Sequence, residues 1–277
     1  MKKRPLVILT GPTAVGKTKL SVELAKKIGG EILSADSMQV YRQMDIGSAK
    51  IRSEEMEGVP HHLLDILDPW DEFNVVIFQQ KCKECLERIY AAGHIPILVG
   101  GTGFYIQAIL HDIDFTENRR SDYRKDLEVL SLTTGGPAEL HQRLSLVDPE
   151  AALVIHENNV KRTIRALEFY QLTGMKISEH NQTQREKEAA YNACFFVLTD
   201  NRQKLYERID ERVDQMFSDG LLEEVIRLKE MGCHKDMVSM QGLGYKEILA
   251  YLDGETTLEE ATYLLKRDTR HFAKRQL

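Results

Sequence analysis

A glycine-rich loop near the start of the chain has the residue types needed to bind a phosphate. The segment Gly11-Pro-Thr-Ala-Val-Gly-Lys-Thr18 matches the pattern G-x-x-x-x-G-K-[ST]. Glycines allow the backbone to curl so that successive amides face phosphate oxygens, and the start of the next helix adds positive potential. Lys17 supplies a mobile cation, and the hydroxyl of Thr18 can coordinate Mg²⁺. The pattern predicts a phosphate site but specifies no reaction.

Carboxylates at the ends of predicted strands form the second group of candidate catalytic residues. Kinases that bind phosphate in such a loop need an Asp at a strand end to help hold Mg²⁺. Asp36 follows the apolar run Glu31–Ala35, and Asp200 follows the run Phe195–Thr199. Because Asp200 directly precedes a helical pattern, we interpret it as the N-cap of that helix. Asp36 is therefore the stronger candidate for chemistry.

The residues alone leave three roles open for Asp36: a metal ligand, an N-cap or a general base. It ends its strand at the carboxyl edge of the sheet, where open α/β folds bind their ligands. The following segment Ser37–Tyr41 is too apolar to surround a phosphate and suits a base or aromatic ligand better. A third predicted strand runs into Gly100, Gly101 and Thr102, so it offers no carboxylate.

Alternating apolar and amphipathic segments predict the fold that positions these residues. Short apolar runs indicate four buried parallel strands, at Leu6–Thr10, Glu31–Ala35, Ile95–Gly100 and Phe195–Thr199. Helical patterns follow the first three of these regions, at Lys17–Ile28, Val75–Ala92 and Thr102–Leu110. This alternation is typical of an open α/β sheet.

Residues 114–190 differ in character from the rest of the chain. They are polar, rich in helix formers and without a convincing strand pattern. We expect helices there at Ser121–Leu130, Ala138–Leu146 and Asn159–Leu172. The predicted organisation is therefore an α/β domain of residues 1–113 and 191–277 that is interrupted by a helical insertion of residues 114–190.

The composition is that of an ordinary globular protein, with 42% apolar and 29% charged residues. The formal net charge of −6 means that any RNA binding has to depend on local basic patches. The apolar run Leu6–Thr10 is too short for a signal peptide or a membrane span. Cys82 and Cys85 are expected on a helix surface as unpaired thiols. These features predict a cytoplasmic protein.

Eight segments of the chain, in order, resemble the tRNA dimethylallyltransferase family, the bacterial tRNA isopentenyltransferases. They are GPTAVGKT (Gly11–Thr18), ADSMQVYRQMDIGSAK (Ala35–Lys50), PHHLLDILDP (Pro60–Pro69), IPILVGGTGFY (Ile95–Tyr105), NNVKRTIRALE (Asn158–Glu168), LYERIDERVDQM (Leu205–Met216), QGLGYKE (Gln241–Glu247) and FAKRQL (Phe272–Leu277). Eight ordered matches over nearly the whole chain make the resemblance specific. The family usually continues past the last segment, where this sequence stops, so the resemblance assigns no tRNA contact to such a tail.

The resemblance implies a prenyl transfer. The donor would be dimethylallyl diphosphate, the acceptor would be the exocyclic amine of the adenosine 3′-adjacent to the anticodon in tRNA, and diphosphate would be released. Mg²⁺ would be the cofactor. The implied fold is a P-loop kinase-like parallel sheet core, with a helical insertion that grips the anticodon stem. We also expect a monomer that does not bind membranes.

The resemblance assigns a role to each candidate site residue. Asp36 would be the general base, Thr102 would hydrogen-bond the reacting base, and Arg212 would clamp the diphosphate. The donor site would comprise Gly11, Thr13, Ala14, Val15, Gly16, Lys17 and Thr18, with Thr18 also the metal ligand. The tRNA site would comprise Asp36, Ser37, Met38, Gln39, Arg124, Lys161, Arg162, Thr163, Ile164, Arg165, Gln241, Gly242, Leu243, Gly244, Tyr245 and Lys246.

Without the resemblance, the charged residues favour a plainer interpretation. Arg208 and Arg212 share one helix face, where pairs with Glu207 and Glu211 on a solvated surface are the simpler expectation. The basic run around Lys161 alone is likewise typical of an ordinary charged surface. The resemblance favours Arg212 as a functional residue and the basic helices as RNA-binding tracks.

Three other functions fit parts of the sequence. An adenylate isopentenyltransferase would share the glycine loop and Asp36 but would not need the helical insertion. A small-molecule kinase would use Asp200 or Asp36 to hold magnesium. A nucleotide-gated RNA-binding module would perform no chemistry at all. An assay with labelled dimethylallyl diphosphate distinguishes these possibilities, because each predicts a different molecule that acquires the label.

Overall fold

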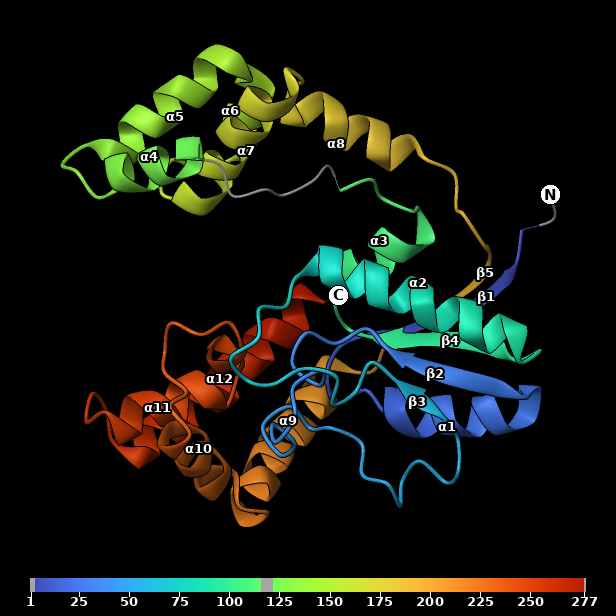
Figure 1. The fold of residues 1–277 in the computed structure, drawn as a ribbon. Coiled ribbons are helices and arrows are strands. Elements are labelled where there is room, and N and C mark those ends of the chain that lie inside the picture. The colour runs from blue at the N-terminus through green and yellow to red at the C-terminus, as the bar shows by residue number, and fades with distance from the viewer. Residues whose placement is uncertain (1–2, 116–121, 277) are drawn as a thin grey trace. The chain divides into compact units, whose positions relative to one another are not determined.

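In a computed structural model of the chain, residues 3–115 and 122–276 are described (Figure 1). The chain forms two compact units. One unit comprises Met1–Asp112 and Ala189–Leu277, and the other comprises Ile113–Glu188. The helical insertion expected at residues 114–190 thus corresponds to the second unit within two residues at each end.

The first unit contains a five-stranded sheet in the order β3-β2-β4-β1-β5, in which every pair of neighbours is parallel. Its strands are β1 (Pro5–Thr10), β2 (Gly30–Ser34), β3 (His61–His62), β4 (Ile95–Gly100) and β5 (Asn192–Val197). This confirms the predicted parallel α/β sheet. Two details were wrong: the two-residue strand β3 was not predicted, and β5 starts three residues before Phe195 and ends at Val197 rather than Thr199.

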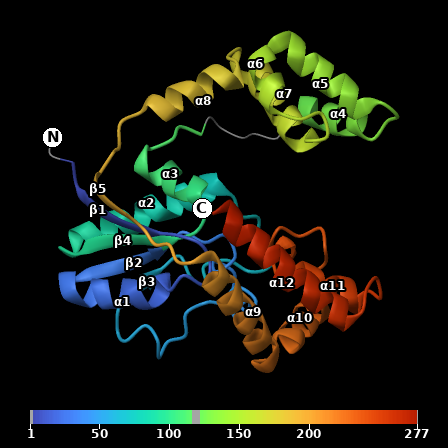
Figure 2. The same ribbon diagram turned by 180° about the vertical axis from the view of Figure 1, so that it is seen from behind.

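The strands are apolar because helices cover both faces of the sheet (Figures 1 and 2). The covering helices are α1 (Lys17–Ile28) on one face, and α2 (Val75–Ala91) and α3 (Gly103–Leu110) on the other. Ile97 of β4 is fully buried, and Val22 and Ala25 of α1 pack in the same cluster. The side chain of Asn74 accepts hydrogen bonds from two amides of α2 and so starts that helix.

Cys82 and Cys85 are buried on the inner face of α2, so the expectation of a helix surface was wrong. Both are free thiols. The amphipathic pattern of α2 left its buried face ambiguous, and the small apolar cysteine side chain belongs on that face because cysteine is among the residues most often buried.

Beyond β5 the first unit is helical. Its helices are α9 (Arg202–Ser218), α10 (Leu221–Glu230), the 3₁₀ turn η1 (Ser239–Gln241), α11 (Tyr245–Leu252) and α12 (Leu258–Arg275). The N-cap of α9 is Asn201, whose side chain accepts hydrogen bonds from Gln203 N and Lys204 N. The prediction that Asp200 caps this helix was therefore wrong by one residue. Asp200 instead accepts from the amide of Asn201 and pairs with Arg208 at 2.7 Å.

The second unit is helical in its described residues. It contains α4 (Asp122–Ser131), α5 (Gly136–Val147), α6 (Pro149–Val154), α7 (Val160–Thr173) and α8 (Ile177–Glu186). Leu140 and Leu144 of α5 are fully buried in its own apolar core, which also holds Leu127 and Leu167. Helices α6 and α8 were not predicted. Throughout the described part of the chain, no helix is long and apolar enough to cross a membrane.

Candidate active site

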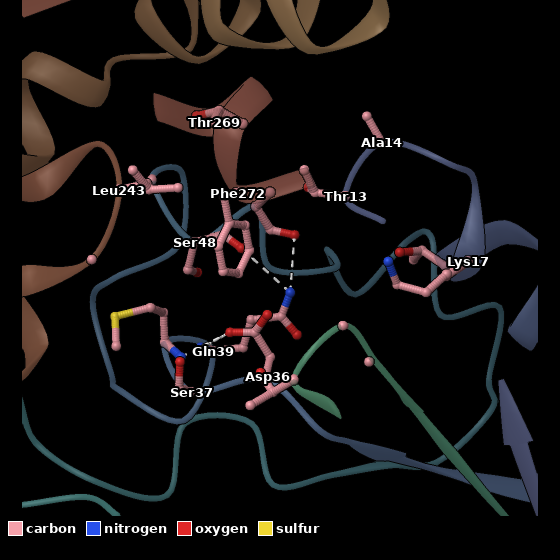
Figure 3. A pocket seen from close by; sticks show the side chains of 18 of the residues that line it. Thr13, Ala14, Lys17, Asp36, Ser37, Gln39, Ser48, Leu243, Thr269 and Phe272 are labelled. Atoms are coloured by element: carbon pink, nitrogen blue, oxygen red, sulfur yellow. Dashed lines mark hydrogen bonds between the residues drawn. The ribbon is translucent and has the colours of Figure 1, made fainter. Parts of the chain in front are cut away.

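A cavity of about 1010 Å³ in the first unit lies where three strands end (Figure 3). The glycine loop Gly11–Thr18 follows β1, Asp36 follows β2, and Thr102 follows β4. Residues from α9 and α12 complete the lining. Because the carboxyl ends of parallel strands meet at one edge of the sheet, residues distant in sequence face the same space.

The glycine loop is held in a curled conformation. Gly11 has φ 143°, Ala14 has φ 62° and Gly16 has φ 96°, so three residues of the loop adopt positive backbone φ angles. Such turns direct successive amides into one concave surface, which suits an anion. Gly16 occupies the N-cap position of α1, so the positive end of that helix opens into the same loop. The local geometry favours phosphate binding.

Lys17 projects from the first turn of α1 toward the loop (Figure 3). Its Nζ donates hydrogen bonds to the carbonyls of Gly11, at 2.7 Å, and Pro12, at 2.8 Å. The pKa of Lys17 is lowered to about 8, chiefly by burial and also by the charge of Arg212, while Asp36 opposes the shift. A partly desolvated ammonium beside an anion-binding loop is stabilised when a diphosphate binds, because it then forms charge-assisted hydrogen bonds.

Asp36 lies at the end of β2 and interacts electrostatically with Lys17 and Arg212. Its Oδ1 accepts hydrogen bonds from Met38 N, at 2.8 Å, and from Gln39 N, at 3.3 Å. These bonds cap a turn, because no helix begins in this segment. One carboxylate oxygen therefore shapes the local backbone, while the side chain lines the cavity that also contains Lys17.

Thr102 reaches the same cavity from β4. It stands at the N-cap position of α3, but within this described segment its hydroxyl caps no amide of the helix. The preceding Gly100 allows a close approach of β4 to β2, since a Cβ added there would lie 2.3 Å from Ala35 O. This approach brings the strand ends that carry Asp36 and Thr102 together.

Arg212 enters from α9. Ile209 and Val213 of the same helix are buried, at 1% and 2% exposure, and fix the helix position. Burial lowers the pKa of Arg212, while Asp36 and Glu55 oppose the shift. No ion pair joins Arg212 to Glu211 within the described residues. The solvated-pair interpretation therefore does not describe Arg212, and Arg208 pairs with Asp200 instead.

The segments expected to contact tRNA are only partly accessible. The cavity lining includes Ser37, Met38, Gln39, Gln241, Gly242, Leu243 and Lys246. The side chain of Gln39 is held in place, because its amide nitrogen donates hydrogen bonds to the carbonyls of Ser48 and Ala49, both at 3.3 Å (Figure 3). Gly244 is buried. These bonds give the segment after Asp36 a defined shape before any ligand binds.

Tyr245 has an interior position. Its side chain is fully buried, and its hydroxyl donates to Glu224 at 2.8 Å and accepts from Ser48 N at 3.1 Å. The carboxylate of Glu224 also accepts from the amides of Asp45, Ile46 and Gly47. The side chain of Tyr245 is thus committed to holding a loop and is unavailable to RNA.

The remaining expected tRNA-binding residues belong to the second unit. Lys161, Arg162 and Arg165 are exposed on α7, whereas Thr163 and Ile164 face the core, at 0% and 3% exposure. Helical spacing explains this split, since every third or fourth residue turns inward. Arg124 donates to Glu128 and Glu168 within the unit.

One face of α12 lines the cavity, although no role was predicted for it from the sequence. It consists of Leu265, Thr269, Phe272 and, just beyond the helix, Gln276. Thr269 and Phe272 appear in Figure 3 opposite Asp36. Their spacing of four, three and four residues is a helical face, which could have indicated that this side of α12 points to a common target.

Comparison with known proteins places this site in a family. Residues 39–277 match the profile described as IPP transferase, and residues 5–68 match that described as isopentenyl transferase. The chain belongs to the IPP transferase family. This family member is 63% identical over 275 residues to the tRNA dimethylallyltransferase of Lachnoclostridium phytofermentans, covering 99% of this chain and 88% of the relative. It is 51% identical to that of Bacillus velezensis, covering 100% and 87%.

Solved structures agree with this assignment. The IPP transferase family member aligns with the tRNA isopentenylpyrophosphate transferase of Bacillus halodurans at a TM-score of 0.74 and 48% identity, covering 99% of this chain and 86% of the other. It also aligns with a eukaryotic dimethylallyltransferase acting on tRNA at a TM-score of 0.86 and 33% identity, covering 99% and 69%. The P-loop-like parallel fold is therefore shared.

Proposed function

We propose that this protein is a tRNA dimethylallyltransferase that prenylates the exocyclic amine of the adenosine 3′-adjacent to the anticodon. The observation that carries the proposal is the cavity in which an anion-binding loop lies together with Asp36 and Thr102, in a chain of this family. A kinase needs the phosphate site as well, but its alternative magnesium ligand, Asp200, is absent from the cavity lining and is paired with Arg208.

The residues suggest how transfer proceeds. The carbon–oxygen bond of dimethylallyl diphosphate breaks, and negative charge builds on the departing diphosphate. The loop amides, Lys17 and Arg212 stabilise this charge without reorganising. The adenine nitrogen forms the new carbon–nitrogen bond, and its proton passes to the carboxylate of Asp36. Thr102 hydrogen-bonds the base and orients its amine. The base has to leave its stack in the anticodon loop to reach the cavity.

The site also fits Mg²⁺. Magnesium is usually bound by one or two carboxylates, substrate phosphates and water rather than by an all-protein cage. Thr18 and Asp36 line the same cavity, and the described residues contain no cluster of three or more histidine, cysteine or acidic ligands. Thr18, together with the diphosphate of the donor, would hold the ion. When bound, it would supply positive charge beside the leaving group.

One assay tests the proposed function against its alternatives. Labelled dimethylallyl diphosphate is mixed with the protein, Mg²⁺, unmodified tRNA, AMP and ATP, and the products are separated. We expect label in tRNA. Label in AMP or ATP identifies an adenylate isopentenyltransferase, phosphate transfer from ATP identifies a kinase, and RNA binding without label leaves a binding module. The helical unit with exposed Lys161, Arg162 and Arg165 supports tRNA over a free nucleotide.

Replacement of Thr102 is expected to slow transfer more than it weakens tRNA binding. Thr102→Ala removes one hydrogen bond to the reacting base, which corresponds to a fall in turnover of about 10-fold. Many other contacts hold the tRNA, so its affinity changes little. Thr102→Ser keeps the hydroxyl and serves as the matched control. A variant that binds tRNA weakly but turns over normally at saturation assigns Thr102 to tRNA positioning instead.

Salt dependence tests the basic surfaces. If Lys161, Arg162 and Arg165 contact phosphates, tRNA affinity falls steeply with ionic strength. Neutralising one of them should flatten the slope of log affinity against log salt by about 0.7 to 0.9. Lys27→Gln, at the exposed end of α1, is the control that leaves the slope unchanged. An affinity that does not depend on salt contradicts this interface.

A further inference from the structure

The segment after α12 connects two loops of the active site. Gln276 directly follows α12, and both the oxygen and the nitrogen of its side-chain amide form hydrogen bonds. Its Oε1 accepts a hydrogen bond from Thr13 N at 2.9 Å, and its Nε2 donates to Gly101 O at 3.1 Å. Thr13 belongs to the glycine loop, and Gly101 directly precedes Thr102. One side chain therefore joins the donor side of the cavity to the acceptor side.

These two bonds match the chemistry of a glutamine. An amide presents one acceptor and one donor, whereas glutamate presents only acceptors and would face the Gly101 carbonyl with like partial charge. Asparagine is one methylene shorter, so it cannot span the same two partners from an unmoved backbone. Each bond fixes a peptide plane: one in the glycine loop, the other in the peptide that leads into Thr102.

The glycine at position 101 is explained by this bridge. A Cβ added to Gly101 would lie 2.1 Å from Nε2 of Gln276, which is closer than any real contact of this kind. A side chain at position 101 would therefore displace the amide of Gln276. Glycine at this position therefore leaves room for the bridge, as expected where another group contacts the main chain.

The end of α12 is held against the glycine loop by apolar packing as well. Ala273 is fully buried and shares a cluster with Leu205 and Ile209 of α9, against which Ala14 and Val15 pack. Gln276 is three residues further along the chain. The helices α9 and α12 thus place its amide at a fixed distance from the loop, and α9 also carries Arg212.

We propose that Gln276 is a positioning residue, which holds the glycine loop and the Gly101–Thr102 peptide in register so that the donor carbon and the acceptor amine align. The proposal rests on the proposed transfer reaction. Small misplacements of reacting groups reduce rates strongly, because the advantage of binding both substrates depends on their mutual orientation. Gln276 acts through Thr13 and Thr102 and is not assigned contact with the reacting atoms.

Replacement of Gln276 tests this role in the whole protein. We expect Gln276→Ala to lower the single-turnover rate with saturating tRNA about 10- to 100-fold, as two partly buried hydrogen bonds are lost. The KM for dimethylallyl diphosphate should rise and the affinity for inorganic diphosphate should fall, while tRNA affinity and the melting temperature stay near those of the wild type. Gln276→Glu should be at least as slow. Gln80→Ala, on the exposed face of α2, is the control.

A double-mutant cycle with Thr102→Ala separates positioning from a simple structural role. If Gln276 acts through the Gly101–Thr102 peptide, the effect of Thr102→Ala should shrink when Gln276 is already Ala, so that the two rate losses do not multiply. Multiplying losses overturn the proposal. A lower melting temperature with unchanged donor parameters, or a loss of tRNA affinity alone, overturns it too.

The diphosphate measurement keeps this proposal distinct from the proposed function. If the wild type binds inorganic diphosphate but transfers no prenyl group to tRNA, the proposed function is wrong. In that case an unchanged diphosphate affinity in Gln276→Ala also rejects the role at the glycine loop, and a reduced affinity retains it.

Discussion

Asp36→Asn is expected to bind both substrates near normally and to lower the single-turnover rate about 10²- to 10⁴-fold, the usual contribution of a general base. The substitution is well matched to the site. The side-chain oxygen of asparagine can still accept from Met38 N and Gln39 N, so the turn after β2 is retained. What is lost is the ability to take a proton from the adenine amine.

The rate of Asp36→Asn is measured across a Mg²⁺ series with both substrates saturating. A slow rate that Mg²⁺ does not restore supports a general base. Partial recovery at high Mg²⁺ identifies a metal ligand, because excess ion compensates for a lost carboxylate. An unchanged rate removes Asp36 from the mechanism and leaves it a turn cap. Asp200→Asn, in the loop between β5 and α9, is the control and should transfer at the normal rate.

The parts of this site that are local in sequence could be predicted. The glycine loop follows β1 and opens α1, so the pattern of residues around Lys17 specifies both conformation and environment. Asp36 and Thr102 could also be placed at one edge, because parallel strands end on the same side of a sheet. These conclusions depend only on strand positions and on chain direction.

The parts that depend on distant contacts could not be predicted. The sequence around Tyr245 gives no sign that its side chain is buried. Its hydroxyl donates to Glu224, which lies 21 residues away, and this contact holds the side chain in the core. Gln276 meets Thr13 across 263 residues. The two-residue strand β3 forms only because β2 is there to pair with it. Local patterns contain no information on such partners, and tertiary contacts decide them.

Lys17→Met is expected to reduce kcat/KM for dimethylallyl diphosphate by about 10²-fold, since charge-assisted hydrogen bonds to a diphosphate are lost. The variant should fold normally, and its melting temperature should change little, because removal of the buried charge offsets the loss of the hydrogen bonds to Gly11 O and Pro12 O. Burial lowers the pKa of Lys17 to about 8, so its charged form is disfavoured in the folded protein, and a methionine of similar length removes that penalty. Normal donor kinetics in Lys17→Met would show that the glycine loop is not the donor site.

The same side chain predicts a pH dependence. In the free protein Lys17 is charged below its pKa of about 8 and neutral above it, so kcat/KM for the donor should fall as the pH rises through 8.

The effect of Lys17 on stability has the opposite dependence on pH. The folded state binds fewer protons at Lys17 than the unfolded state between pH 8 and the ordinary lysine pKa of 10.5, so this group increases the free energy of unfolding as the pH rises across that window. Lys17→Arg separates the two effects, because a guanidinium stays charged. The decline above pH 8 should disappear in Lys17→Arg, and a decline that persists assigns the titration to another group.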